Sequence, residues 1–369
     1  MNAIYGLAGS FIGIFIPIYL LQKNLNPANV FSFYLIYTLV ILVFFFITSK
    51  LVRVIGLRKT VLLGYPFLFL YFFLLYTLNQ YGTPIYVLAC VSGIQASLYW
   101  FPLHMWLANT SREGAIGSDL GKFFAASQIV GLFAPAIAAF IVLFFGFKSL
   151  FLLAAGIYLV SAIPIFYLPE FPFNEEIRVK RLFQLLKEYP HYIVAEILEN
   201  IREDAEGIIW PVFIYLTFRN ILAIGYIGTI SGVGAILFNL FIGKYTDKID
   251  KRKLLGAGAL IMVVIWLVRF FAVTPLLAYS LTLISAFFGI LIMIPINTMV
   301  YGLAKREGAP TFILFREFGV TLGRVVLYVF AFFVVQSINY IFIFTAAACL
   351  GLFCLSRKNL ELKMVSSNI

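Results

Sequence analysis

Long, uninterrupted apolar segments recur along the whole 369-residue chain, and they constrain its fold more than any other feature. A helix needs about 20 apolar residues to cross the hydrocarbon core of a bilayer. Segments of about this length are residues 2–21, 30–49, 60–79, 84–107, 121–145 and 149–168, followed by 200–218, 221–242, 254–273, 277–303, 311–335 and 338–355. The sequence therefore predicts an all-α membrane protein with twelve transmembrane helices.

The composition excludes several other classes of protein. Hydrophobic residues make up 63% of the chain and charged residues 12%, whereas a soluble domain carries about a quarter charged residues. The apolar runs are continuous, and the strands of a membrane barrel would alternate. The net charge of +11 fits basic cytoplasmic loops, so we expect no nucleic-acid partner. Cys90, Cys349 and Cys354 lie in apolar runs and indicate no metal site or disulfide.

One long polar segment, residues 169–194, separates the two sets of six apolar segments. It holds eight charged residues and three prolines. We therefore divide the chain into an N-terminal six-helix bundle (1–168), a cytoplasmic linker (169–194), a C-terminal six-helix bundle (195–355) and a cytoplasmic tail (356–369). The first segment starts almost at Met1 without a basic n-region, so we expect it to be a retained helix and not a signal peptide.

The distribution of lysine and arginine predicts the orientation. If both termini and the linker lie in the cytoplasm, twenty of these residues lie on that side and only Lys23, Lys148 and Arg219 on the other. Cytoplasmic loops of membrane proteins are enriched in Lys and Arg. We expect an integral protein of the cell (plasma) membrane, surrounded by the lipid bilayer, with both termini cytoplasmic.

The two halves repeat each other in sequence at a constant shift of 194 residues. The matched positions include residues 13–17 with 207–211, Lys50 with Lys244, residues 58–59 with 252–253, and residues 112–115 with 306–309. The shift spans six helices, an even number, so both halves insert with the same orientation. Such a parallel repeat is typical of two bundles that rock around a central site.

The loop after the eighth segment, GKYTDKIDKRK at residues 243–253, resembles a signature of the major facilitator superfamily. In that signature a glycine and three residues precede Asp, Arg, any residue, Gly, Arg and a further basic residue. Gly243, Asp247 and Arg252 match, and Asp250 stands where glycine is usual. The first-half loop keeps Gly56 and Arg58.

The resemblance implies that Asp247 and Arg252 hold the two bundles together on the cytoplasmic side. A solvated basic turn that only sets the topology is the alternative. The resemblance also implies that the first, fourth, seventh and tenth helices line a central cavity. Candidate substrate-cavity residues on these helices are Tyr19, Gln95, Tyr99, Trp210 and Asn297.

Charged residues cluster at the entry to the seventh helix. Glu199, Arg202, Glu203 and Glu206 follow the spacing i, i+3, i+4, i+7 and so share one helix face. Ionisable groups inside a membrane are costly and mark functional sites. In one interpretation Glu206 or Glu203 binds and releases a proton during transport. In the other, Arg202 pairs with Glu206 and Glu199 and closes a cytoplasmic gate.

The fourth, ninth and eleventh helices carry further charged or titratable groups. Glu317 and Arg324 lie seven residues apart on one face, and Arg324 is a candidate counter-ion, a ligand for an anionic solute, or part of a structural ion pair. Arg269 lies near the outer end of its helix, where we expect it to reach the interface. His104 is either a proton relay or a hydrogen-bonded interface residue.

These features favour a secondary active transporter that moves a small-molecule solute by alternating access. We expect protons as the coupling ion, no cofactor, and a monomer. The acidic cluster favours efflux of an amphipathic or cationic compound, and the alternatives are uptake of a sugar or organic anion, or a sensor that binds solute without moving it. An enzyme is not expected, because the chain has two histidines and no HExxH or GxSxG arrangement.

Overall fold

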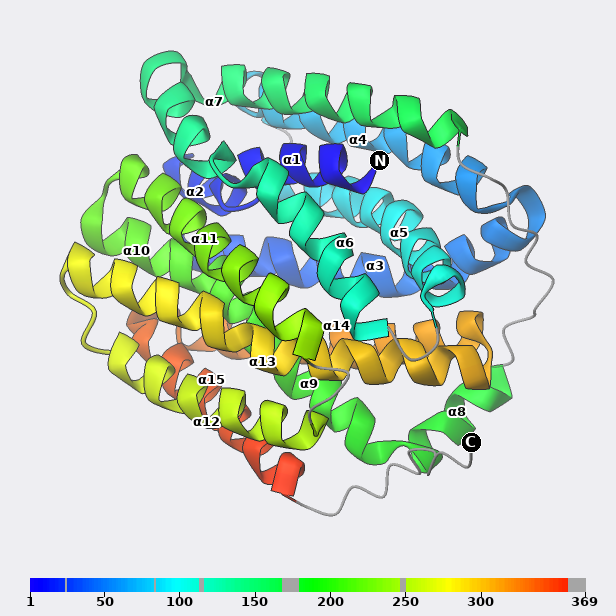
Figure 1. Ribbon diagram of the computed structural model, residues 1–369. Helices are drawn as coiled ribbons and strands as arrows, with labels where there is room; N and C mark the ends of the chain where they lie inside the picture. The colour runs from blue at the N-terminus through cyan, green and yellow to red at the C-terminus, as the bar shows by residue number, and fades with distance from the viewer. Residues whose placement is uncertain (24, 83, 113–115, 168–178, 246–249, 358–369) are drawn as a thin grey trace.

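The computed structural model describes residues 1–23, 25–82, 84–112, 116–167, 179–245 and 250–357, and in these residues it contains helices and no strands (Figure 1). The elements are α1 (Asn2–Ile12), α2 (Phe15–Gln22), α3 (Pro27–Ile55), α4 (Leu57–Tyr81), α5 (Ile85–Thr110), α6 (Ile116–Gly131), α7 (Ala134–Ala162), η1 (Ile163–Tyr167), α8 (Val179–Glu188), α9 (Pro190–Asp204), η2 (Ala205–Ile209), α10 (Trp210–Phe218), α11 (Ile221–Tyr245), α12 (Lys251–Arg269), α13 (Pro275–Glu307), α14 (Ala309–Phe333), η3 (Val335–Ser337) and α15 (Asn339–Arg357).

Grouped by the spans they form, these elements confirm the predicted twelve-helix architecture. The first span consists of α1 and α2, and the seventh of α9, η2 and α10. Helix α7 contributes to two spans, because Gly146 (φ 77°, ψ 170°) interrupts its helical backbone. By length and hydropathy alone, seven stretches of the described chain could cross a membrane, and one of them, Ser118–Tyr167, is 50 residues long.

Local signals explain where several helices begin and end. The side chain of Asn26 accepts a hydrogen bond from the backbone N–H of Asn29, and Pro27 begins α3. Asp250 caps α12 in the same way. Gly56 (φ 88°) and Gly308 (φ 94°) form the tight turns between α3 and α4 and between α13 and α14. Glycine suits these turns because it adopts positive φ without steric cost.

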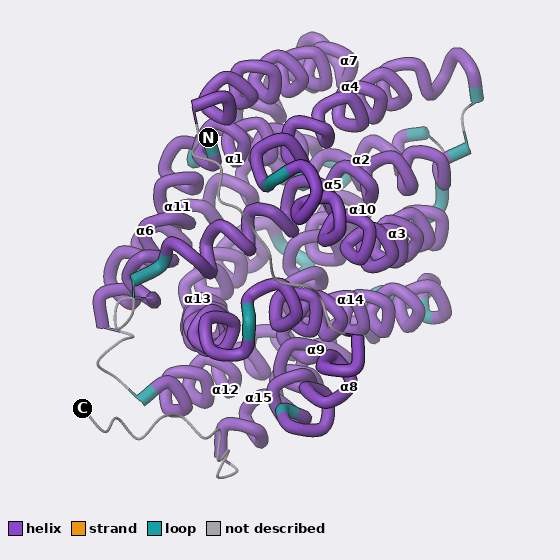
Figure 2. Tube along the Cα trace, turned by 90° about the vertical axis from the view of Figure 1, so that its right-hand side faces the viewer, coloured by secondary structure: helices purple, strands orange, loops and turns teal. Residues whose placement is uncertain are grey.

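Figure 2 looks along the helices, with α4 and α7 at the top, α12 and α15 at the bottom, and α10 and α11 among the helices α1–α7. We call α1–α7 the first half and α9–α15 the second half. The halves meet where α3 packs on α14 and where α11 packs on α6 and α7. The 194-residue shift maps α3 onto α11 and α6 onto α14, so the two interfaces are counterparts. This is the arrangement expected of a parallel repeat around a central axis.

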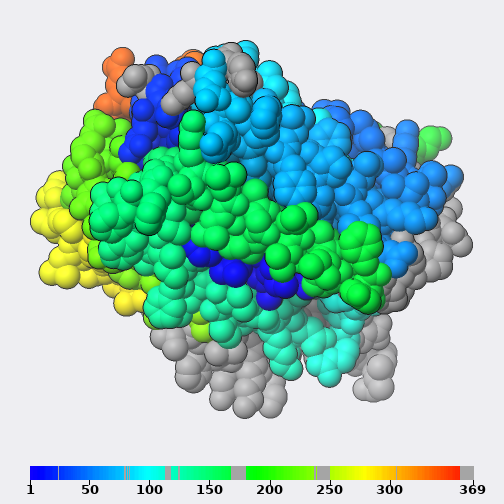
Figure 3. Space-filling model, turned by 90° about the horizontal axis from the view of Figure 1, so that it is seen from above, coloured from blue at the N-terminus to red at the C-terminus, as the bar shows by residue number. Residues whose placement is uncertain are grey.

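The outer surface of the bundle is apolar. Figure 3 shows the face covered by α4 and α7, with a strip of the first helix visible beside α7. Large apolar side chains stand exposed on both helices, among them Leu70, Phe73, Phe144, Leu152 and Leu159. An apolar exterior of this extent suits contact with lipid and not with water.

The two ends of the bundle differ. The turns at Gly56 and Gly308 and the helix α8 lie at the right-hand end in Figure 1, which we call the α8 end. Helix α9 begins there at Pro190, ten residues before the predicted start of the seventh apolar segment. The prediction placed this boundary too late because Glu196 and Glu199, which interrupt the hydropathy, are buried inside the bundle.

Candidate functional site

A cavity of about 470 Å³ lies between the two halves. The first half contributes residues from α1 to α5 and from α7, and the second half contributes α9, η2, α13 and α14. The expectation from the first, fourth, seventh and tenth helices is therefore incomplete, because α3 and α14 also supply much of the lining. A cavity of this size can hold a small organic molecule.

The wall formed by the first half is largely aromatic. Its rings come mostly from α3, α4 and α5 and are those of Phe33, Tyr34, Tyr37, Phe45, Tyr71, Trp100 and Tyr158. Tyr34 stacks on Tyr328 of α14, with ring centroids 5.6 Å apart. Gln95 adds an amide to this wall, and its Nε2 donates to the hydroxyl of Tyr5 at 2.8 Å.

The wall formed by the second half carries the charges. Glu196, Glu199, Glu203 and Asp204 of α9 line it together with Arg316, Glu317 and Arg324 of α14. Helices α9 and α14 pack against each other along this wall. Charged side chains spaced three, four or seven residues apart on each helix therefore face one space.

The charged groups are organised in two clusters along α14. Near the α8 end, Arg316 donates to Glu317 and has its Nε 3.8 Å from Oε1 of Glu196. Two turns further along, the Nε of Arg324 is 3.1 Å from Oδ1 of Asp204, and Tyr328 donates to the other oxygen of Asp204 at 2.7 Å. Such pairing is what makes buried charges tolerable.

The acids outnumber the bases around the cavity. Five carboxylates line it, and the guanidinium groups of Arg316 and Arg324 line it as well. Arg202 is counted as a third base because its Nε donates to the cavity residue Glu199 at 2.8 Å. Glu203 has the weakest contact, since its Oε2 is 4.0 Å from Arg324 and its side chain is 51% exposed. Two carboxylates are thus left for a proton or a cationic ligand to neutralise.

His104 of α5 lines the cavity from the first half and contacts the second half. Its Nδ1 is 2.7 Å from the hydroxyl of Tyr301, and its Nε2 is 3.5 Å from Nη1 of Arg316. Oε1 of Glu317 is 3.7 Å from the same Nε2. The ring also lies against Trp100. Both interpretations of His104, relay and interface residue, are compatible with this position.

The structure brings together seven of the residues singled out from the sequence. The residues that line the cavity are Gln95, His104, Glu199, Glu203, Asn297, Glu317 and Arg324. Arg202 lies just behind this wall and pairs with Glu199, as one of the two interpretations expected. The other partner expected for Arg202, Glu206, pairs with Arg269 instead.

Glu206 lies elsewhere, in an ion pair that the sequence did not indicate. Arg269 donates to both of its carboxylate oxygens at 2.7 and 2.6 Å, and Ser285 donates to one of them at 2.6 Å. The guanidinium of Arg269 is fully buried between the rings of Trp210 and Trp266, at 4.2 and 4.1 Å from their centroids. Arg269 therefore does not reach the interface, because its partner lies inside the second half.

The π-helical turn η2 explains why Trp210 is also away from the cavity. Trp210 follows Glu203 by seven residues and would share its face in a continuous α-helix. A π turn contains one more residue than an α turn, so α10 is rotated by about 100° relative to α9. Trp210 is buried and donates from Nε1 to Thr282 at 2.9 Å.

Tyr19 and Tyr99 pack inside the first half and are not among the described residues that line the cavity. Tyr19 donates to the carbonyl of Leu75 at 2.9 Å. Tyr99 stacks on Tyr5 with ring centroids 3.5 Å apart, and its hydroxyl donates to Asn2 at 3.3 Å. Tyr19 thereby contacts α4, which lines the cavity. Tyr99 packs on Tyr5, and the hydroxyl of Tyr5 accepts the hydrogen bond from Gln95.

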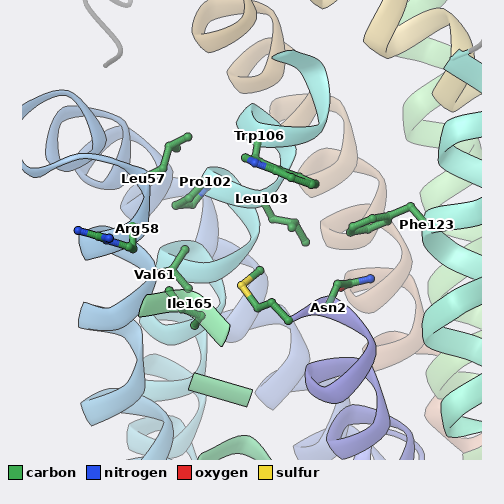
Figure 4. A pocket seen from close by; sticks show the side chains of 10 residues that line it. Asn2, Leu57, Arg58, Val61, Pro102, Leu103, Trp106, Phe123 and Ile165 are labelled. Carbon is green, nitrogen blue, oxygen red and sulfur yellow. The ribbon is translucent and has the colours of Figure 1, made fainter. Parts of the chain in front are cut away.

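The loop motif is only partly described. Asp247 lies outside the described residues, and Gly243 lies in the last turns of α11. Arg252 follows the cap of α12, and Arg58 donates to the carbonyl of Phe166 at 3.2 Å. Arg58 also lines a smaller pocket of about 230 Å³ within the first half, with Met1, Asn2 and Trp106 (Figure 4).

A second set of charged contacts holds α8 against the end of α13, beyond the membrane-spanning segments. Arg181 and Tyr189 both donate to Glu307, Tyr189 at 2.8 Å. Burial raises the pKa of Glu307, but these hydrogen bonds outweigh it and the pKa is lowered overall. Burial and the bond to Glu307 raise the pKa of Tyr189 to about 12.

The sequence did not predict that Glu196, Asp204, Arg316 and the tyrosines of α3 line the cavity. A usable signal existed for Glu196, which precedes Glu203 by seven residues on the same helix face. Tyr34 and Tyr37 are likewise three residues apart. Among the described residues, no group of three or more His, Cys, Asp or Glu side chains is placed to hold a metal ion.

Comparisons with known proteins bear on the whole chain. A sequence model described as Major Facilitator Superfamily matches residues 1–193 and 204–360. No curated protein matches the chain. Among solved structures, the major facilitator superfamily transporter FucP in the outward conformation aligns with a TM-score of 0.71 at 14% identity, over 96% of this chain and 96% of that chain.

Two further structures align over similar lengths. The human organic anion transporter MFSD10 (TETRAN) has a TM-score of 0.67 at 13% identity, over 96% of this chain and 97% of its own. A variant of the E. coli Fucose:proton symporter FucP has a TM-score of 0.68 at 15% identity, over 96% of each chain. At these identities the similarity shows a shared fold.

Proposed function

The chain belongs to the major facilitator superfamily, whose members are transporters and not enzymes, and from that premise we propose that it is a proton-coupled secondary transporter. In this proposal a small solute binds in the cavity between the halves and crosses the membrane as the halves rock about it. Both termini and α8 lie in the cytoplasm, and the protein works in the plasma membrane as a monomer.

The observation that carries the proposal is the unequal chemistry of the two cavity walls. Aromatic rings of the first half offer apolar surface and π faces, which attract organic cations. The wall of the second half presents five carboxylates against three guanidinium groups. An aromatic or amphipathic cation would satisfy both walls at once.

The same charge balance suggests how the solute and protons are coupled. A carboxylate that faces a low-dielectric cavity needs a positive partner, which can be a proton or a cationic solute. Because both compete for the same excess negative charge, binding of one favours release of the other. This competition favours exchange of protons for solute and therefore efflux, with Glu203 as the coupling acid, since its contact with Arg324 is the longest of the cavity pairs.

Two other classes of solute, organic anions and sugars, are each supported by particular cavity residues. The two arginines of α14 could bind an anion, and the similar MFSD10 is described as an organic anion transporter. FucP is described as a fucose:proton symporter, and the cavity includes Gln95 and Asn297, which can hydrogen-bond a sugar. Uptake of a sugar or an organic anion is therefore the alternative.

The test is transport in liposomes that contain a trapped pH dye, with aromatic quaternary ammonium ions, neutral sugars and organic anions as solutes. We expect proton movement that depends on an aromatic cation and runs opposite to it, and we expect Glu203→Gln to abolish it. Glu188→Gln, at an exposed acid of α8, is the matched control. Solute binding without any flux would indicate a sensor, and flux without protons a uniporter.

Glu206→Gln separates the two candidate coupling acids. Because Glu206 is paired with Arg269 outside the cavity, we expect the folded fraction of this variant to keep its solute-dependent proton flux. Loss of flux in Glu206→Gln together with normal flux in Glu203→Gln would move the coupling role to Glu206.

A further inference from the structure

His104 is a titratable side chain of the first half whose two ring nitrogens both face the second half. Tyr301 of α13 lies at Nδ1, and Arg316 and Glu317 of α14 lie at Nε2. The ring is nearly enclosed, with its side chain 12% exposed. The proton exchange proposed above makes no use of this residue.

The neighbours of His104 determine where its proton lies. A guanidinium can only donate hydrogen bonds, so Nε2 accepts from Arg316 and carries no proton. Nδ1 must then hold the ring proton and donate to the hydroxyl of Tyr301. The ring is neutral in this arrangement, and its contact with Arg316 at 3.5 Å is long.

A second proton on Nε2 would change the partners of the ring. The new N–H cannot bond to Arg316, but it faces Oε1 of Glu317 at 3.7 Å. Glu196 and Glu317 carry two negative charges around one positive charge on Arg316, so the cluster has an excess of one negative charge. A protonated His104 cancels that excess and exchanges a long neutral contact for an ion pair.

We propose that His104 is a second proton-binding site and that its protonation strengthens a bridge between the two halves. The bridge joins α5 of the first half to α13 and α14 of the second half near the α8 end. Uptake of a proton at Nε2 favours the state in which the halves are joined there, and its loss favours separation. This inference depends on the proposed function only for the role that the bridge has in the transport cycle.

The charged and titratable groups that face His104 all belong to the second half. Tyr301 comes from α13, whereas Arg316, Glu317 and the more distant Arg324 come from α14. Glu196 of α9 lies behind Arg316. On its own helix the ring lies against Trp100, which does not titrate. The response of the bridge to pH is therefore set by one histidine against this cluster.

The first test measures the distance between the halves in lipid nanodiscs without any solute. Spin labels are placed at Thr110→Cys on α5 and Lys253→Cys on α12, both exposed positions, after replacement of the three native cysteines. Between about pH 8 and pH 4, a range that extends well below the ordinary pKa of histidine, we expect the shorter-distance population to grow. His104→Gln should keep the high-pH distribution throughout.

The chain has two histidines, and the second provides the matched control. His191 is exposed at the start of α9, so His191→Gln should leave the pH response unchanged. A native protein whose distances do not change with pH, or a His104→Gln variant that still responds, would overturn the proposal.

A second measurement keeps the proposal testable if His104→Gln does not fold. In the native chain labelled with ¹⁵N-histidine, two imidazole signals are expected, and His191→Gln assigns them. We expect His104 to be the Nδ1–H tautomer at high pH and doubly protonated at low pH, in parallel with the distance change. A ring that stays neutral while the halves move would refute the bridge, and neither test depends on finding the transported solute.

Discussion

At the scale of single residues, the second half contains two kinds of buried ion pair with different surroundings. The pairs on α9 and α14 face a cavity, where a ligand can replace a partner. Glu206 and Arg269 are enclosed by Trp210, Trp266 and Ser285. Neither residue of this pair lines the cavity, so we expect the pair to have a structural role.

Replacing Arg269 tests this distinction. Arg269→Met leaves the carboxylate of Glu206 without its partner, and breaking a buried pair in this way costs about 3–5 kcal/mol. We expect a clear fall in the thermal unfolding midpoint of the purified protein, with Arg219→Met at an exposed position as the control. The double variant Arg269→Met/Glu206→Gln should recover part of the loss. Unchanged stability in the single variant would show that the pair is not structural.

The sequence could predict which residue types matter inside the membrane but not which of them meet. Glu203, Glu317 and Arg324 were recognised because charge inside an apolar segment is rare. The partner of Glu206 was not, because Arg269 lies 63 residues away on another helix. Pairing of this kind depends on tertiary packing, which a periodic pattern on one helix does not contain.

At the scale of helices, the seventh span shows how one irregular turn redirects a whole face. The spacing from Glu199 to Trp210 assumes 3.6 residues per turn throughout, and η2 breaks that assumption between Glu203 and Trp210. The sequence signal near the turn is Pro211, which lacks the N–H that an α-helix would bond to the carbonyl of Gly207. The acids of α9 therefore face the cavity while Trp210 faces Arg269.

The contact between α8 and α13 should depend on pH in a predictable direction. The pKa of Glu307 is lowered in the folded protein, so its contribution is fully present above the ordinary glutamate pKa of about 4.3 and is lost as the pH falls through the folded value. We expect amide exchange in α8, corrected for its intrinsic pH dependence, to accelerate in that acid range.

Glu307→Gln provides the comparison for α8. This variant should show faster exchange of α8 already at neutral pH, because it lacks the carboxylate that accepts from Arg181 and Tyr189. It should then show little further change on acidification. Equal acid responses in both proteins would assign the effect to another group.

At the scale of the whole molecule, the helix count and the parallel repeat were predictable because they depend on segment length and on a constant shift. The pairing of α3 with α14 and of α11 with α6 follows from that symmetry once two halves face each other. The cavity walls break the symmetry, since one half supplies rings and the other supplies charges. This difference is what a transporter needs to recognise a solute of mixed character.

If solute and protons compete for the carboxylates between the halves, binding of the solute must release protons, and this release can be measured. An aromatic cation that the liposome assay identifies is added to the purified protein in weakly buffered solution, and the pH change is recorded. We expect binding to release protons from the native protein and to release fewer from Glu203→Gln. Proton uptake on binding, or no change in either protein, would contradict it.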